Sequence, residues 1–349
     1  MVDLSKNTPD FITDEVQLDS VLTTSSAQLR KFIPQVSSPL IILGAGGKMG
    51  PTLAVLAKHA ADLAGHPLEV IAVSRYSNDA SRQWLENNGV QTVTADLVDD
   101  ATWPTLPDSE NVIFLVGQKF GTERNPGLTW ALNTLVPAAA CKRYSNARLV
   151  ALSTGCVYPH VPTDSGGATE STTPEPVGEY ASACLARERL FEFYAQQNST
   201  AITLVRLNYA IDLRYGVLHD IALKIWRGDP VDLSMGYFNC IWQGDANERI
   251  LRSLGLCHNP PHLINLTSPG TLSVQTVAQQ LGDLLKRQVQ FIGTEAKTAW
   301  LSNPTAAVKI LGTPETSLDT MLRWTAHWTR TEGRSHGKPT HFEVRDGKY

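Results

Sequence analysis

The sequence predicts an α/β protein built on a doubly wound parallel sheet, with a smaller lobe formed by the C-terminal part of the chain. Two observations support this fold class. Between residues 40 and 207, short apolar runs alternate with stretches of helical length and period, which is the order that gives parallel strands joined by crossover helices. The first apolar run leads directly into a glycine-rich turn and a helical stretch, as a nucleotide-binding β-α-β unit requires.

The strands and helices of this sheet are expected in alternation. Six apolar runs have the length of strands, at residues 40–43, 68–73, 90–94, 112–116, 148–152 and 202–207. The helical stretches between them lie at residues 49–63, 78–88, 128–143 and 180–197. Crossover helices cover both faces of such a sheet, so its strands are buried and need not alternate polar with apolar residues.

The chain is expected to have four segments. Residues 1–37 form an N-terminal extension packed outside the core, with one helix at about residues 14–32 that ends before Pro34. Residues 38–208 form the sheet domain, and residues 209–332 form a smaller lobe that closes over a ligand. The expected helices of that lobe lie near residues 216–227, 245–256, 273–287 and 314–331. Residues 333–349 are expected to be an extended surface tail.

Composition excludes several classes of partner. The 349 residues carry 30 Lys and Arg against 34 Asp and Glu, a formal net charge of −4, which argues against nucleic acids and anionic membranes as partners. The start of the chain has no secretory signal and no run approaches the roughly 20 apolar residues of a membrane span, so a cytoplasmic protein is expected. Five cysteines stand singly, without zinc-ligand spacing, so neither a metal site nor a disulfide framework is expected.

The turn after the first strand is predicted to bind the pyrophosphate of a dinucleotide, as in Rossmann-type domains. It consists of Gly44, Ala45, Gly46, Gly47, Lys48, Met49 and Gly50. Gly44 permits the tight turn, Gly47 lets the backbone approach the pyrophosphate, and Gly50 allows the helix to pack closely on the sheet. The helix N-terminus adds unpaired N–H groups and the positive end of its dipole. The alternative is a glycine-rich turn that serves packing only.

The end of the second strand favours NADP over NAD as the cofactor. An NAD-selective site places Asp or Glu here to hold the ribose 2′-hydroxyl. This chain has Ser74 and Arg75 instead, a hydroxyl and a guanidinium that suit a 2′-phosphate. NAD remains the alternative, with Arg75 stacking on adenine or facing solvent.

Through these features, residues 40–207 resemble the extended short-chain dehydrogenase/reductases, the family of NAD(P)-dependent epimerases and dehydratases. Further residues that match positions of this family lie after the third strand, at the end of the fourth strand and on the helix that follows it. By position they imply that the cofactor contacts Asp96, Leu97, Val116, Gly117 and Gln118, and that Asn133 is the structural asparagine of the family.

The resemblance also implies the catalytic residues. Thr154, at the end of the fifth strand, matches the family's Ser/Thr that hydrogen-bonds the reacting oxygen, and Tyr180 matches its acid/base tyrosine. Cys184 stands where the family has lysine. A free phenol titrates near ~10 and the family's lysine lowers that value, which the neutral thiol of Cys184 does not do. Lys48, Arg187 and Arg189 are candidate substitutes.

Three readings remain open at this point. In the first, the chain is an oxidoreductase, epimerase or dehydratase in which neutral Tyr180 donates a proton. In the second, it binds NAD(P) as a non-catalytic sensor or partner subunit. In the third, Cys184 is itself a nucleophile or redox thiol, against which stands the usual inertness of buried thiols.

The resemblance implies a sugar, sugar acid or nucleotide sugar as the substrate. Gln118 and Lys119, after the fourth strand, are candidates to face it. A nucleotide sugar needs cations for its diphosphate, and the second lobe offers Arg214, Lys224, Arg227, Arg249 and Arg252. Scattered helix-surface basic residues explain this set equally well. Family relatives commonly form dimers, and a homodimer through residues 128–135 and 185–194 is expected.

Overall fold

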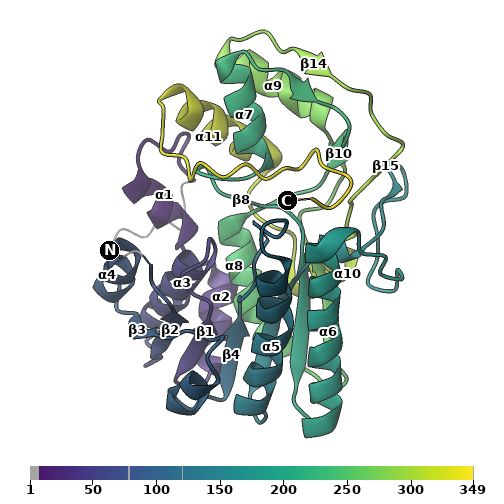
Figure 1. Cartoon of the computed structure of the whole chain (residues 1–349). Helices are drawn as coiled ribbons and strands as arrows, with labels where there is room; N and C mark the ends of the chain where they lie inside the picture. Colours follow the sequence, from purple (N-terminus) through teal and green to yellow (C-terminus); the bar gives the residue numbers. More distant parts are fainter. Residues whose placement is uncertain (1–7, 78, 120, 349) are drawn as a thin grey trace.

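The predicted doubly wound α/β class is confirmed by the computed structural model, which describes residues 8–77, 79–119 and 121–348. Seven parallel strands form the central sheet in the order β12-β7-β5-β4-β1-β2-β3 (Figure 1). These strands are β1 (Leu40–Leu43), β2 (Val70–Ser74), β3 (Gln91–Thr94), β4 (Asn111–Phe114), β5 (Arg148–Thr154), β7 (Ile202–Leu207) and β12 (His262–Leu266). The first six are the predicted ones.

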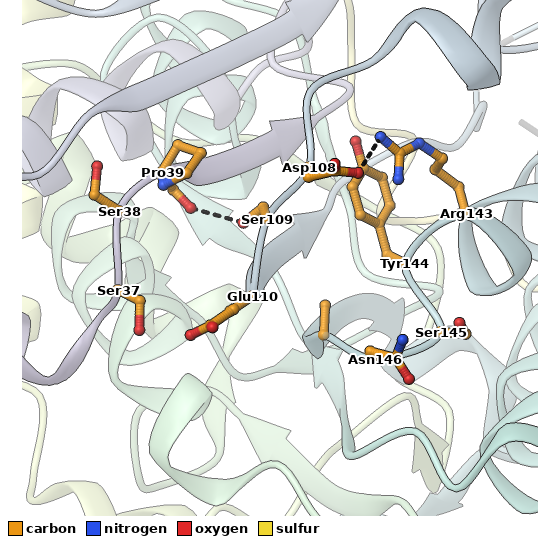
Figure 2. Close-up of a pocket in the computed structure, with 11 residues that line it drawn as sticks. Ser37, Ser38, Pro39, Asp108, Ser109, Glu110, Arg143, Tyr144, Ser145 and Asn146 are labelled. Carbon is orange, nitrogen blue, oxygen red and sulfur yellow. Dashed lines mark hydrogen bonds and ion pairs between the residues drawn. The ribbon is translucent and has the colours of Figure 1, made fainter.

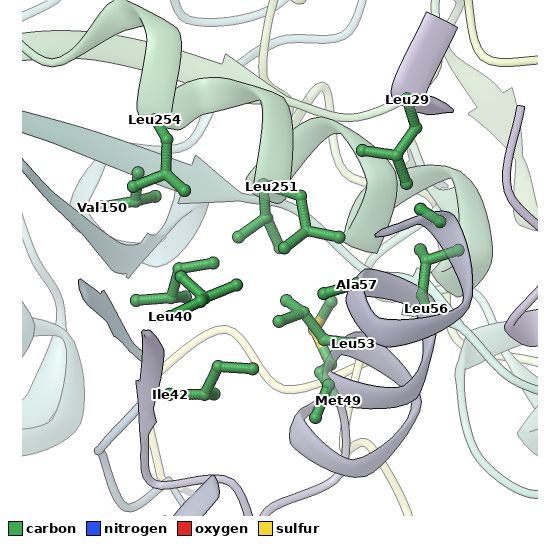
Figure 3. Packing of buried hydrophobic residues seen from close by; sticks show 14 of the residues in the cluster. Leu29, Leu40, Ile42, Met49, Leu53, Leu56, Ala57, Val150, Leu251 and Leu254 are labelled. Atoms are coloured by element: carbon green, nitrogen blue, oxygen red, sulfur yellow. The ribbon is translucent and has the colours of Figure 1, made fainter. Parts of the chain in front are cut away.

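Helices cover both faces of the sheet because each central strand is apolar on both sides. In β1, Leu40 and Ile42 point to one face, where they meet α3 and α8 (Figure 3), and Ile41 and Leu43 point to the other. The second face is covered by α5 and α6. The helices of this layered core are α3 (Gly50–Leu63), α4 (Asp79–Asn87), α5 (Pro126–Arg143), α6 (Gly178–Asn198), α8 (Gln243–Arg252) and α10 (Thr305–Leu311).

A second lobe stands over the carboxyl ends of the strands. Its helices are α7 (Val217–Arg227), α9 (Val274–Leu285) and α11 (Leu318–Arg330), which pack around Trp242 and Trp324. Short strand pairs complete the lobe and its border: β6 (Val161–Pro162), β8 (Ala210–Ile211), β9 (Val231–Asp232), β10 (Tyr237–Phe238), β11 (Ile241–Trp242), β13 (Leu272–Ser273), β14 (Phe291–Ile292) and β15 (Thr298–Ala299). None of the described helices is long and apolar enough to cross a bilayer.

The expectation that the N-terminal segment lies outside the core is wrong. Its predicted single helix is two helices, α1 (Glu15–Leu22) and α2 (Ala27–Phe32), because Ser26 caps a new helix after α1 ends. Leu18 and Leu22 are fully buried in the core of the second lobe, while Leu29 is buried against α3 and α8. The segment therefore spans both lobes and buries the apolar face of each of its helices.

Residues 334–339 are exposed, as a surface tail would be, but the expectation is wrong for the rest of the described segment 333–348, where Thr340, Phe342 and Gly347 are buried. This segment, here called the C-terminal strap, runs back between the second lobe and the sheet domain (Figure 1). Phe342 is 1% exposed within the core of the second lobe, and Thr340 is equally buried. Burial of the apolar ring of Phe342 away from water is favourable, and this burial holds the strap against the second lobe.

Candidate active site and cofactor site

The predicted site residues gather at the carboxyl ends of the strands, around the point where strand order reverses. From β1 the chain goes to β2 and β3 on one side, and β4, β5, β7 and β12 follow on the other. Such a reversal leaves a crevice outside the strand ends, where ligands bind. The turn after β1 and the loop after β4 meet there, because a Cβ added to Gly44 would lie 2.8 Å from the backbone nitrogen of Val116.

The glycines of this turn meet different requirements. Gly44 has φ +82°, and a Cβ on Gly50 would overlap the Ala45 carbonyl, so the fold itself needs both. An added Cβ on Gly47 would have only an ordinary contact, 3.4 Å from the Gly44 oxygen. Gly46 and Gly47 are exposed. The open space at Gly47 fits the close approach of a pyrophosphate to the backbone.

The residues proposed to face the adenosine end lie along the edge formed by β2 and β3. Ser74 is half-buried beside Gly46, whose added Cβ would overlap its hydroxyl, while Arg75 is exposed. After β3, Asp96 accepts a hydrogen bond from the Val98 nitrogen at 3.1 Å, which holds the turn, and Leu97 is buried. The carboxylate of Asp96 is exposed at this edge.

Lys48 leaves the glycine turn and reaches the second lobe. Its Nζ donates to the Ala210 carbonyl at 2.6 Å and lies 4.2 Å from the centre of the Tyr215 ring. Burial lowers the pKa of Lys48 to about 7, although the charge of Asp212 opposes this. The lysine therefore ties the turn to the lobe while holding a proton only weakly at neutral pH.

Thr154 ends β5 and begins a short 3₁₀ helix, Gly155–Val157. Its hydroxyl accepts a hydrogen bond from the Cys156 nitrogen at 3.2 Å. That contact uses an oxygen lone pair and leaves the hydroxyl hydrogen for another acceptor. The Cys156 thiol interacts electrostatically with Tyr180, so the end of β5 and the start of α6 converge.

Tyr180 lies in the first turn of α6, half-buried, with its hydroxyl hydrogen-bonded to Cys184. Burial raises the pKa of Tyr180 well above its ordinary value, with further contributions from Cys184 and Cys156. Cys184 is completely buried and burial raises its pKa as well. Both groups are therefore protonated at neutral pH, and this environment does not favour Cys184 as a nucleophile.

Arg187 brings a cation to the place where the family's lysine is missing. One guanidinium nitrogen lies 3.4 Å from the Cys184 sulfur, and the other donates to the Val116 carbonyl at 3.0 Å and to Asn133 Oδ1 at 3.1 Å. Gly117 makes room for it, because an added Cβ would lie 2.8 Å from the guanidinium. The charge of Arg187 opposes the rise in the pKa of Tyr180. Sequence reasoning had named this arginine only as one of several candidates.

Two residues of the pocket were less visible in the sequence. Lys119 is half-buried on the loop after β4, and burial lowers its pKa, an effect that the nearby carboxylate of Asp220 opposes. Tyr209, after β7, has φ +42° and interacts with Cys156. A tyrosine in the left-handed region is strained, and a single sequence gives no signal for it. Gln118 is half-buried in the same loop as Lys119.

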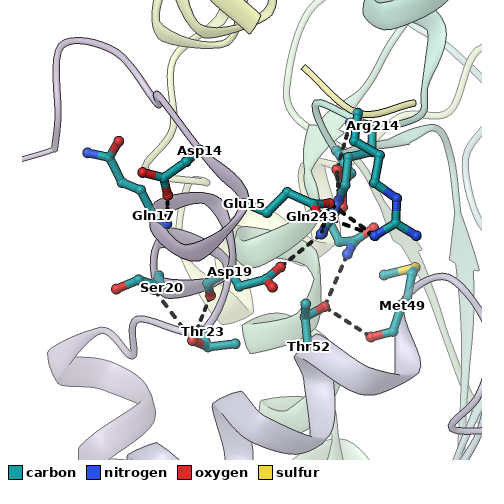
Figure 4. A network of polar contacts seen from close by, with 12 residues as sticks. Asp14, Glu15, Gln17, Asp19, Ser20, Thr23, Met49, Thr52, Arg214 and Gln243 are labelled. Carbon is teal, nitrogen blue, oxygen red and sulfur yellow. Dashed lines mark hydrogen bonds and ion pairs between the residues drawn. The ribbon is translucent and has the colours of Figure 1, made fainter. Parts of the chain in front are cut away.

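A network of polar contacts joins the N-terminal segment to the second lobe (Figure 4). Arg214 pairs with Asp212 at 2.8 Å and with Asp19 of α1 at 2.9 Å. Burial alone would raise the pKa of Asp212, but the hydrogen bonds and charge of Arg214 lower it. Thr52 of α3 accepts hydrogen bonds from Gln243 and Asn247 of α8 nearby. The N-terminal segment is thus bound to the lobe that faces the crevice.

A cavity of about 490 Å³ lies at the opposite end of the sheet (Figure 2). It is lined by residues that precede β1, β4 and β5, among them Pro39, Glu110 and Ala147. Ligands of such sheets bind at the carboxyl ends of the strands, so this cavity is not part of the candidate site. In the described part of the chain, no three His, Cys, Asp or Glu side chains gather as a metal site requires.

Comparisons with known proteins agree with this geometry. UDP-glucose 4-epimerase from Thermus thermophilus, solved with NAD, has a TM-score of 0.66 at 19% identity, over 84% of this chain and 99% of that one. UDP-glucuronic acid 4-epimerase from Bacillus cereus gives 0.69 at 16% identity, over 84% and 99%. dTDP-glucose 4,6-dehydratase from Streptomyces venezuelae gives 0.70 at 17% identity, over 84% and 97%.

These likenesses establish the fold, and a family model matches part of the sequence. No match was found among curated proteins. Residues 40–210 match the model of the NAD dependent epimerase/dehydratase family, a segment that includes the glycine turn, Thr154 and Tyr180. Over this segment, which is just under half of the chain, the protein is similar to the NAD dependent epimerase/dehydratase family, as the resemblance of residues 40–207 predicted.

Proposed function

We propose that this protein is an NAD(P)-dependent oxidoreductase, epimerase or dehydratase that acts on a sugar, sugar acid or nucleotide sugar. The observation that carries this proposal is the convergence of Tyr180, the Thr154–Cys156 turn and the end of β4 beside the glycine turn. A substrate hydroxyl or carbonyl in this crevice meets one acid and one hydroxyl. The relatives with similar folds are named for their action on nucleotide sugars.

The residues present fit a dinucleotide. The open backbone at Gly46 and Gly47 would hold the pyrophosphate, Ser74 and Arg75 the adenosine ribose, and Gly117 and the residues beside it the nicotinamide end. When bound, the nicotinamide supplies hydride transfer. The two nucleotides differ by a 2′-phosphate, and we infer NADP as the preferred one because Arg75 offers an exposed guanidinium at this edge.

The protein's own part in the reaction is proton transfer and orientation. Neutral Tyr180 donates its proton to the substrate oxygen as negative charge develops there, and Thr154 donates a hydrogen bond to the same oxygen. Arg187 acts as a positioning residue, since its charge lies beneath Cys184 and favours the tyrosinate that proton donation leaves behind. The fixed charge of Arg187 thereby takes over the electrostatic role of the missing lysine.

The second candidate function is a sensor or partner subunit that binds NAD(P) without turnover. The specific observation in its favour is Cys184, because no lysine on α6 can contact the nicotinamide ribose from this position. Absorbance at the reduced-nicotinamide band separates the two candidates. A net oxidoreductase changes this absorbance when it receives its sugar, whereas a sensor changes only its melting temperature. An epimerase or dehydratase returns the hydride within each cycle, so it is recognised instead by conversion of the sugar to product.

The first test is a thermal-shift titration of the protein with NADP, NADPH, NAD and NADH. A ligand that binds only the native state raises the melting temperature with its concentration. We expect all four to stabilise the protein, the phosphorylated pair most. If none of the four does so, the proposed function fails.

Arg75 is expected to decide between the two cofactors. Replacing it with serine removes a charge-assisted contact and weakens NADP binding by about tenfold, while NAD binding changes little. The matched control is Arg82→Ser, an exposed arginine on α4 that pairs with Glu86. Isothermal titration of both variants with both cofactors measures the effect. An equal loss for NAD and NADP would assign Arg75 to adenine instead.

Lys48 is expected to make cofactor binding depend on pH. With its pKa near 7 in the free protein, an approaching pyrophosphate raises that pKa and binding takes up a proton. Affinity therefore falls as pH rises from 6 to 8, by up to about tenfold for one linked proton. The variant Lys48→Met loses this dependence. If titrations at several pH values give the same slope for both proteins, Lys48 has no part in binding.

The expected homodimer has support from exposed apolar side chains on α5 and α6. Leu135 of α5 is 65% exposed and Phe193 of α6 is 56% exposed. We propose that these helices pair between two copies. Light scattering should give a dimer mass for the natural chain and a monomer mass for Leu135→Glu; a natural chain that is already monomeric would refute the pairing.

A further inference from the structure

The C-terminal strap, residues 333–348, is held at four points, His336, Thr340, Glu343 and Arg345. The His336 nitrogen donates to the Arg214 carbonyl at 3.0 Å, and the Thr340 nitrogen donates to the Asp220 carboxylate at 2.7 Å. Farther along, Glu343 lies 3.4 Å from Lys224, and Arg345 donates to the Thr298 carbonyl at 2.7 Å. With Phe342 buried between these contacts, the strap is a built part of the lobe.

The strap also contacts the sheet domain, on both sides of the candidate active site. Lys119, on the loop after β4, donates to the Thr340 carbonyl at 3.2 Å. At the other end, the backbone of Gly347 packs on Val177 and Gly178, so closely that an added Cβ would overlap the Val177 carbonyl. Gly178 begins the helix that carries Tyr180. The strap thus joins the two lobes directly outside the crevice (Figure 1).

Tyr209 connects the strap with the interior of the site. Its side chain interacts with Cys156, next to Thr154 and Tyr180, and with Glu343 of the strap. Lys119 likewise interacts with Cys156 while it holds Thr340. Tyr209 and Lys119 therefore each link Cys156, beside Thr154, with a residue of the strap.

The basic residues that the sequence offered for a diphosphate are mostly engaged within the chain. Arg214 is paired with Asp212 and Asp19, and Lys224 with Glu343 of the strap.

Two further basic residues bind elsewhere in the second lobe. Arg249 donates to the Thr313 carbonyl at 2.7 Å, and Arg252 to the Leu311 carbonyl at 2.8 Å. Arg227 is at the last position of α7, seven residues and about 10 Å along the helix from Asp220, where the strap is held. A buried diphosphate without paired cations is strongly disfavoured.

We propose that the strap is the outer wall of the substrate site, and that the substrate is a sugar or sugar acid without a nucleoside diphosphate. This inference rests on the proposed function and narrows its substrate class. The strap lies where a longer substrate would leave the crevice. Its Glu343 pairs with Lys224, which is one of the cations that a diphosphate would need. Tyr180, Thr154 and Lys119 present a phenol, a hydroxyl and an ammonium group at this place, and these suit hydroxyl, carbonyl or carboxylate groups of a substrate.

The wall is tested with a chain that ends at Val344, which loses the contacts of Arg345 and Gly347 but keeps Phe342. Cys156, 7% exposed beside Tyr180, is the reporter for labelling by N-ethylmaleimide. We expect labelling of Cys156 to become at least tenfold faster in the shortened chain, while Cys141 and Cys240, buried in other parts of the protein, keep their rates. Peptide mass spectrometry gives each rate separately.

An unchanged rate at Cys156 would overturn the wall. If all cysteines react faster, the shortened chain is unfolding, and Arg345→Met then replaces it, because this variant removes only hydrogen bonds at the outer end of the strap. Faster labelling confined to Cys156 in Arg345→Met supports the wall, and no change there overturns it.

The substrate class is tested on the full chain loaded with NADP, by isothermal titration with UDP and with UDP-glucose. We expect neither to bind at concentrations up to about 1 mM, a limit near 4 kcal/mol of binding free energy. Micromolar binding of either would overturn the inference while leaving the proposed function intact. Failure of the proposed function shows separately, as the absence of stabilisation by any of the four nicotinamide cofactors.

Discussion

Replacing Tyr180 with phenylalanine is expected to lower kcat by about 10²–10⁴-fold, the range typical of a lost general acid. The phenol lies in the first turn of α6, beside the turn that follows Thr154, and burial keeps its proton in place at neutral pH. The ring remains to pack against its neighbours, and the Cys184 sulfur keeps its contact with Arg187. Cofactor affinity is therefore expected to stay within about twofold in a thermal-shift titration.

Tyr144→Phe is the matched control for Tyr180→Phe. Tyr144 is a buried tyrosine whose hydroxyl donates to the Pro107 carbonyl at 3.1 Å, at the opposite end of the sheet. Its loss lowers stability by about 1 kcal/mol, the value of one hydrogen bond, and leaves kcat unchanged. Full turnover by Tyr180→Phe with any substrate that the natural protein converts would remove Tyr180 from the mechanism.

The second large effect is expected from Gly47→Val, which should weaken NAD(P) binding by at least about tenfold, or 1.4 kcal/mol. An added side chain at Gly47 meets little of the protein itself, since the nearest atom to a new Cβ is 3.4 Å away. It instead fills the space that the pyrophosphate needs. The melting temperature of the cofactor-free protein should change little, because exposed substitutions alter stability by only about 0.5 kcal/mol.

Gly50→Ala gives the opposite pattern and serves as the comparison. Its Cβ overlaps the Ala45 carbonyl between α3 and the turn, and such overpacking lowers stability by about 1–3 kcal/mol. Calorimetric unfolding and cofactor titration of both variants separate the two glycines. Equal destabilisation by the two substitutions would mean that Gly47 serves the fold alone.

The local pattern of the chain was enough to predict six of the seven strands of the central sheet, β1 to β5 and β7, and the helices between them. Parallel strands buried on both faces need unbroken apolar runs, and these runs stand out in any sequence that has them. The glycine turn was equally visible, because a tight turn between a strand and a helix restricts which residues fit.

Elements that depend on tertiary partners were missed. β12 contains Asn265 between apolar residues, and this asparagine is fully buried because Tyr158 and the Ala168 carbonyl satisfy its amide. A buried polar side chain is stable only when such partners arrive from elsewhere in the chain. No window of sequence around β12 contains them.

The sequence by itself determined the fold class and the glycine turn, since both depend on residues that are neighbours along the chain. Thr154, Tyr180 and Cys184 were named through the family resemblance and stay candidates. Only the tertiary structure decided that Arg187 supplies the charge beside Cys184, that α1 and α2 belong to the core, and that the strap contacts both lobes. These outcomes depend on contacts between distant segments, such as Arg187 with Val116 and Lys119 with Thr340. Their free energies are decided by burial and geometry, which local sequence patterns do not contain.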